Sequence, residues 1–183
     1  MAAFDCECLK NLDNNERLVV LFLIVVPQPN IDAVIKMGLS DRLFTSTLKS
    51  LKLKGLIEKV KGFEYLGKRT WSPILKVKYA PNYDETRRYI SLEVLFNRNL
   101  TPLARVLHAY LNNGQPRVEF FSKTIETTLD IPRNTVNLNL ERLNEEGVVE
   151  IVRKEGTQSR VIIFEKVEKR HILSSIFGGQ KGA

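Results

Sequence analysis

One stretch of the chain carries basic and hydrogen-bonding side chains at the spacing of a single helix face. In residues 41–54, Arg42, Thr45, Ser46 and Lys49 recur at i, i+3, i+4 and i+7, so a helix would present them together. Arginine can bind a guanine edge through paired hydrogen bonds, and lysine binds phosphate. This pattern favours a surface that contacts a nucleic acid.

A second stretch has related chemistry further along the chain. Arg133, Asn134 and Asn137 are of the types that bind base edges, because asparagine matches adenine as arginine matches guanine. Other basic side chains are predicted to contact phosphate from the helices or from the loops after them. They are Lys49, Lys52, Lys54, Lys68, Arg69, Arg142, Arg153, Lys154 and Arg160.

The elements that position the second set are readable from residues 124–166. The pattern predicts a short helix, a tight turn, a longer helix and then two strands separated by a polar loop. Pro132 suits the first turn of the longer helix, and Gly147 suits its left-handed C-cap. Val136, Leu140 and Leu143 form one apolar stripe on that helix. The order is that of a winged helix-turn-helix.

The same order occurs earlier, at an offset of 92 residues. Aligning Gly55 with Gly147 places Leu48 on Leu140 and the apolar residues around it on their later counterparts. The segment 31–37 gives the short helix, and Ser40 caps the longer helix over 41–54. Strands are predicted at 56–61 and 71–79. A repeated unit of this kind indicates an internal duplication.

This repeated pattern resembles the broad winged helix-turn-helix superfamily, in particular small prokaryotic regulators of the MarR and ArsR kind. The resemblance covers most of the chain, but it is one of pattern, and no motif identifies a single protein. It implies an α+β fold of two tandem winged helix-turn-helix domains joined by a helical connector.

We therefore expect a first winged-helix domain over residues 1–81, a connector over 82–100 and a second domain over 101–183. The apolar stripe in 84–97 predicts a connecting helix, and residues 102–111 open the second domain as another helix. A helix is also predicted from a cap at Asn14 to Val26, a short strand at 117–120, and a final helix at 167–177. Residues 1–13 and the tail 178–183 are expected to be loose.

The charge balance favours a polyanionic partner. The 183 residues carry a formal net charge of +7. Residues 1–80 hold 13 basic and 8 acidic residues, and residues 81–183 hold 15 and 13, so the first half carries most of the excess. We expect double-stranded DNA as the partner.

Other classes find little support in the sequence. Cys6 and Cys8 are too few and too close for a disulfide framework, which favours a reducing cytoplasm, and we expect no metal and no cofactor. The apolar run 18–26 is too short to span a bilayer, so no membrane association is expected. His108 is expected to be structural, and no arrangement of nucleophile and base suggests an enzyme.

The leading hypothesis is a cytoplasmic, nucleoid-associated transcriptional regulator that acts as a homodimer. Its 41–54 helix would enter a major groove, and its wings would contact the backbone. The segments 15–26, 84–97 and 168–177 are the candidate dimer interface. One alternative is plasmid or viral replication initiation, or DNA segregation, where tandem winged helices also occur.

A second alternative is a protein–protein scaffold, because some tandem winged helices of chromosome-condensation and membrane-sorting complexes bind proteins. The second longer helix motivates this alternative. It has Leu138 where the first has Ser46, and Glu141 where the first has Lys49. Glutamates repel a phosphate backbone, so the second domain is expected to contact DNA weakly or to bind a protein partner.

Overall fold

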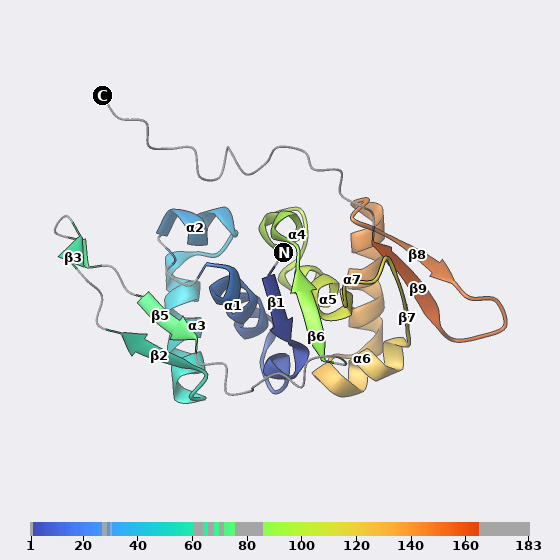
Figure 1. Cartoon of the computed structure of the whole chain (residues 1–183), viewed down its shortest axis with the longest axis horizontal. Helices are drawn as coiled ribbons and strands as arrows, with labels where there is room; N and C mark the ends of the chain where they lie inside the picture. The colour runs from blue at the N-terminus through green and yellow to red at the C-terminus, as the bar shows by residue number, and fades with distance from the viewer. Residues whose placement is uncertain are drawn as a thin grey trace, which may run out of the picture.

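The computed structural model describes residues 2–26, 29, 31–60, 64–65, 68–69, 72–75 and 86–164. Within these residues the chain mixes helices with small antiparallel sheets, in agreement with the predicted α+β class. Helices α1 (Asn14–Val25) and α5 (Pro102–Leu111) lie at the centre, and α3 (Asp41–Leu53) and α7 (Arg133–Glu145) flank them on opposite sides (Figure 1). The hairpins extend outward.

The first half begins with a strand and ends in a hairpin. Its elements are β1 (Ala2–Asp5), the 3-10 helix η1 (Cys6–Leu9), α1 (Asn14–Val25), α2 (Ile31–Lys36), α3 (Asp41–Leu53), β2 (Ile57–Val60), β3 (Glu64–Tyr65), β4 (Lys68–Arg69) and β5 (Ser72–Leu75). Strand β2 pairs with β5, and β3 pairs with β4 between them. The predicted two-stranded wing is therefore extended by a second short ladder.

The second half repeats this order with an added strand, β7 (Arg117–Phe120), and without a counterpart of the short β3–β4 ladder among the described residues. Its elements are β6 (Arg87–Ile90), α4 (Leu92–Phe96), α5 (Pro102–Leu111), β7 (Arg117–Phe120), α6 (Ser122–Leu129), α7 (Arg133–Glu145), β8 (Val149–Arg153) and β9 (Arg160–Phe164). The predicted strand at 117–120 is confirmed as β7, which pairs with β9 to form a three-stranded sheet in the order β7-β9-β8.

The offset of 92 residues is reproduced in the backbone. Helices α3 and α7 begin and end 92 residues apart. Gly38 and Asp130, which precede them, both have positive φ, and so do Gly55 and Gly147, which follow them. The hydrogen bond from Leu56 N to Leu51 O (3.0 Å) has its counterpart from Val148 N to Leu143 O (3.1 Å). Equal turns at equal positions orient the two long helices alike within their halves.

Local signals explain where the helices start. Asp13, rather than the predicted Asn14, caps α1, because its carboxylate accepts from Glu16 N (2.8 Å) while Glu16 accepts from Asp13 N (2.8 Å), a reciprocal capping box. Ser40 caps α3 as predicted. Thr101 caps α5, with Pro102 at its first position.

Two predictions, one about the N-terminal segment and one about the segment between the two halves, are wrong. Residues 2–9 are ordered as β1 and η1, and residues 87–96 form a strand and a short helix instead of the connecting helix predicted over 84–97. The reason is a distant pairing: β1 and β6 are antiparallel, with Ala2 opposite Ile90 and Asp5 opposite Arg87. An apolar stripe at helical spacing cannot reveal a strand whose partner lies 85 residues earlier.

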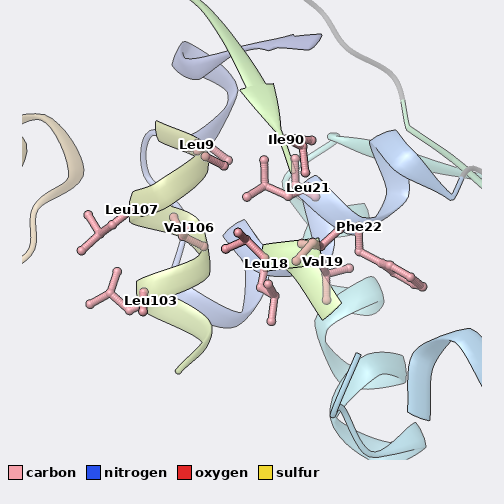
Figure 2. Packing of buried hydrophobic residues seen from close by; sticks show 14 of the residues in the cluster. Leu9, Leu18, Val19, Leu21, Phe22, Ile90, Leu103, Val106 and Leu107 are labelled. Carbon is pink, nitrogen blue, oxygen red and sulfur yellow. The ribbon is translucent and has the colours of Figure 1, made fainter. Parts of the chain in front are cut away.

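One hydrophobic core runs through both halves. Residues 18–23 of α1 are all 2% exposed or less, because α1 packs on α5 on one side and on α3 on the other. Leu18 and Leu21 of α1 gather with Val106 of α5, Leu9 and Ile90, whereas Leu103 and Leu107 point to the other side of α5 (Figure 2). Burying an aliphatic side chain contributes about 1.5–3 kcal/mol, so this contact is a main source of stability.

This packing changes the role expected for the segment 15–26. Its apolar residues 18–23 are covered within the chain, so they are not available as the predicted dimer interface, while Ile24, Val25 and Val26 are half-buried. The predicted helix 167–177 and the tail 178–183 lie outside the described residues. Among the helices that the structure describes, none has the length and apolar character needed to cross a bilayer.

Candidate nucleic-acid interface

Helix α3 presents one exposed polar face. Arg42, Thr45, Ser46, Lys49 and Lys52 are all exposed. The opposite side of the helix is buried through the residues Phe44, Thr47 and Leu51. The predicted face therefore exists, and it carries three positive charges with no acid among those five residues.

A buried carboxylate fastens α3 to the start of α1. Glu16 is 1% exposed and accepts hydrogen bonds from Ser50 Oγ (2.6 Å) and Lys54 Nζ (2.6 Å). Burial acts to raise the pKa of the Glu16 carboxyl, but the hydrogen bonds from Lys54, Ser50 and Asp13 N outweigh it, so the pKa lies below its ordinary value. The charged network holds α3 in one orientation on the core.

The same network occupies one of the predicted phosphate contacts. Lys54 Nζ also donates to Asn11 O (3.2 Å), so its ammonium is engaged at the base of α1. Lys52 remains exposed on α3. In the described part of the chain, Lys52 is therefore better placed than Lys54 for a phosphate.

Helix α7 presents a different face. Arg133, Asn134, Glu141 and Arg142 are exposed, and Leu138 is 66% exposed. On this face two positive and one negative side chain surround an apolar one. The face has less excess positive charge than that of α3.

Two asparagines of α7 serve the fold. Asn137 is half-buried and accepts from Ser122 Oγ (2.8 Å), which ties α7 to the start of α6 and weakens its candidacy as a base-contacting residue. Asn139, which the sequence analysis did not single out, is buried and hydrogen-bonds Thr101 at the cap of α5. Its only sequence signal is its position on the buried side of the apolar stripe.

Both hairpins carry basic residues that the sequence predicted to contact phosphate. Lys68 and Arg69 form β4, opposite Tyr65 and Glu64, and their side chains lie outside the described set. In the second hairpin Arg153 lies opposite Arg160 in the ladder between β8 and β9. With Glu141, Asn144 and Ile151 these arginines line a hollow between the hairpin and α7.

Lys154 is partly neutralised. Its ammonium lies 3.0 Å from Glu119 on β7, and both side chains are about half exposed. Hydrogen bonds from Ser159 and Lys154 lower the pKa of the Glu119 carboxyl. The ion pair reduces the charge that Lys154 offers to a phosphate.

The two cysteines and the histidine of α5 lie away from this surface. Burial raises the pKa of the Cys6 thiol, and it raises that of Cys8 to about 12, so both are poor nucleophiles at neutral pH. Burial also lowers the pKa of His108 to about 4. Among the described residues there is no cluster of three or more His, Cys, Asp or Glu side chains that could hold a metal ion.

Comparisons with protein-family models, with curated proteins and with solved structures gave no match to this chain.

Proposed function

We propose that this chain binds double-stranded DNA through two winged helix-turn-helix units and acts as a transcriptional regulator in the cytoplasm. Helix α3 enters a major groove, which is wide enough to admit a helix. The hairpin containing Lys68 and Arg69 follows the adjacent backbone. The observation that carries the proposal is the exposed basic face of α3, held on the core by Glu16.

Within this proposal the residues have distinct roles. Arg42, near the start of α3, contacts a base edge, as the first turns of a recognition helix do. Thr45 and Ser46 contact bases or phosphates, while Lys49 and Lys52 bind phosphates along the groove wall. From the second unit, Arg133 and Asn134 contact bases, and Arg142, Arg153 and Arg160 contact the backbone.

The test is binding to a labelled random-sequence duplex across a salt series. We expect log affinity to fall linearly with log salt, at a slope of about −0.9 for each phosphate neutralised. No binding at about 50 mM salt would refute the proposal. A Lys10→Ala variant is a charge-matched control for variants of α3, because Lys10 is exposed but lies outside that helix.

A second candidate function is protein binding by the second unit. It rests on the 66% exposure of Leu138 beside a hollow that Thr101, Glu141, Arg142 and Glu145 also line. If the duplex fails to bind, this candidate takes precedence. If the duplex binds, footprints on iterated origin repeats instead of promoters would assign the protein to replication initiation or DNA segregation.

A further inference from the structure

Two buried arginines join the halves through reciprocal contacts. Arg17 of α1 is 3% exposed and donates through Nη2 to the carbonyl of Leu129, at the end of α6. Arg105 of α5 is 5% exposed and donates through Nη1 to the carbonyl of Met37, just after α2 (2.7 Å). Leu129 and Met37 are 92 residues apart, so they hold equivalent positions. Each arginine therefore binds the end of the other half's short helix.

Reciprocity of this kind is the property of a twofold interface. In a symmetric dimer, a contact of residue i with residue j is repeated as a contact of j with i. Here both copies of the unit belong to one chain. Both arginines are buried, and burial lowers the pKa of each guanidinium group. Each group also donates a hydrogen bond from Nε to a backbone carbonyl of its own half.

Strands β1 and β6 are also arranged as a twofold relation between the halves requires. The antiparallel pairing of β1 with β6 brings the first element of each half together, and a short helix, η1 or α4, follows each strand. In Figure 1, α2 and α6 lie diagonally across the centre from each other, and α3 and α7 lie at opposite sides of the α1–α5 pair. An approximate twofold axis thus passes between β1 and β6 and between α1 and α5.

We propose that a single copy of this chain binds two half-sites of inverted orientation on one duplex, with α3 on one half-site and α7 on the other. This inference rests on the proposed DNA-binding function. Recognition helices related by a twofold axis require half-sites related by one, separated by a whole number of helical turns. The proposal replaces the homodimer expected from the sequence, because the chain supplies both units itself.

The two half-sites differ in sequence. Helix α3 presents Arg42 and Lys49 where α7 presents Asn134 and Glu141, so the bases contacted and the phosphates neutralised are different. The preferred site is therefore an imperfect inverted repeat. The α3 half-site contributes the larger share of the affinity.

The experiment uses the full chain and duplexes selected from a random pool. We expect the selected site to be an inverted repeat, and native mass spectrometry to find one 21.0 kDa chain per duplex. Reversing one half-site should lower the affinity about 100-fold, since it removes the gain from linked binding. Inserting half a helical turn between the half-sites should do the same.

Variants at exposed residues assign the half-sites. Arg42→Ala should remove protection from one half-site in a footprint, and Asn134→Ala should remove it from the other. Two chains per site, a selected direct repeat, or an affinity unchanged by half-site reversal would overturn this inference and leave DNA binding intact. Failure to bind any duplex would overturn the proposed function itself, so the two failures are distinguishable.

Discussion

Helices α3 and α7 have the same length and the same flanking turns, yet their exposed faces are chemically different. Both span 13 residues and end before a glycine of positive φ. At two equivalent positions α3 presents Ser46 and Lys49, where α7 presents Leu138 and Glu141. Packing constrains the buried stripe and the turns but leaves the solvent face free. A repeated order of elements can therefore present two chemically different exposed faces.

The central helices α1 and α5 are also equivalent in position but differ in one buried side chain. Arg17 in α1 and Arg105 in α5 make equivalent contacts at an offset of 88 residues. At that offset Val20 of α1 corresponds to His108 of α5, and both are buried. The two halves thus share a polar contact, but at this buried position only α5 carries a titratable group.

The largest expected effect is on the contact that the halves share. Arg105→Met withdraws hydrogen bonds from the carbonyls of Met37, Leu95 and Leu100 and should lower the free energy of unfolding by about 3 kcal/mol. Arg17→Met should cost a similar amount, because Arg17 also donates to two backbone carbonyls, those of Leu9 and Leu129, and to the side chain of Asn14. Urea denaturation followed by circular dichroism measures both.

The matched control is Arg117→Met, which removes an exposed arginine from β7. It should change the stability by less than about 0.5 kcal/mol. If Arg105→Met were as mild as this control, the reciprocal contact would not be a joint between the halves.

The next prediction concerns the pH dependence of stability that His108 causes in α5, where α1 has Val20. Burial lowers the pKa of this imidazole to about 4 from 6.5, so the unfolded chain takes up the proton first as the pH falls. The contribution of the neutral His108 to the free energy of unfolding is complete above pH 6.5 and is lost as the pH falls from 6.5 to 4. We expect a loss of about 2 kcal/mol between about pH 7.5 and pH 5.

His108→Val gives α5 the residue that α1 carries at the equivalent position. In this variant, the free energy of unfolding measured by urea denaturation should therefore fall by about 2 kcal/mol less between the two pH values. If the pH dependence of the free energy of unfolding were unchanged in this variant, another group, such as a carboxylate, would be its cause. The edge-to-face contact with Phe164 (5.2 Å between ring centroids) would be lost, so stability at neutral pH provides the baseline.

These contrasts show what the sequence could predict. Ser40, Thr101 and the glycines at 55 and 147 act within a few residues of themselves, so the helices they bound were predicted nearly to the residue. The pairing of β1 with β6 was missed because each strand is four residues long and its partner is distant. A strand of this kind carries almost no local signal.

The candidate site was predictable to a similar extent. Helical spacing located the exposed face of α3, since periodicity separates inside from outside. It could not reveal that Lys54 is engaged by Glu16, or that Arg17 and Arg105 are buried and withdrawn from the basic surface. Those facts depend on which distant groups meet each side chain.

The next prediction concerns Arg42, the residue of α3 that we propose contacts a base edge. Arg42→Ala should weaken binding to a selected site by about 1–3 kcal/mol, and weaken binding to random DNA much less. Lys52→Ala should weaken both about equally, because a phosphate contact carries no sequence information. Equal losses on the two duplexes for Arg42→Ala would remove Arg42 from the base-contacting role.

The smallest effect comes from making α7 resemble α3. The double change Leu138→Ser and Glu141→Lys gives α7 the two residues of α3 at equivalent positions, and it should strengthen binding by up to about 1 kcal/mol. The salt slope should steepen by about 0.9, because one more phosphate is neutralised. Glu93→Lys on α4 is the control, since it makes the same charge change at an exposed position away from α7. If the control steepens the slope equally, the gain comes from net charge alone. If only the α7 variant does, the second helix lies against the duplex, and its natural residues keep that half-site weak.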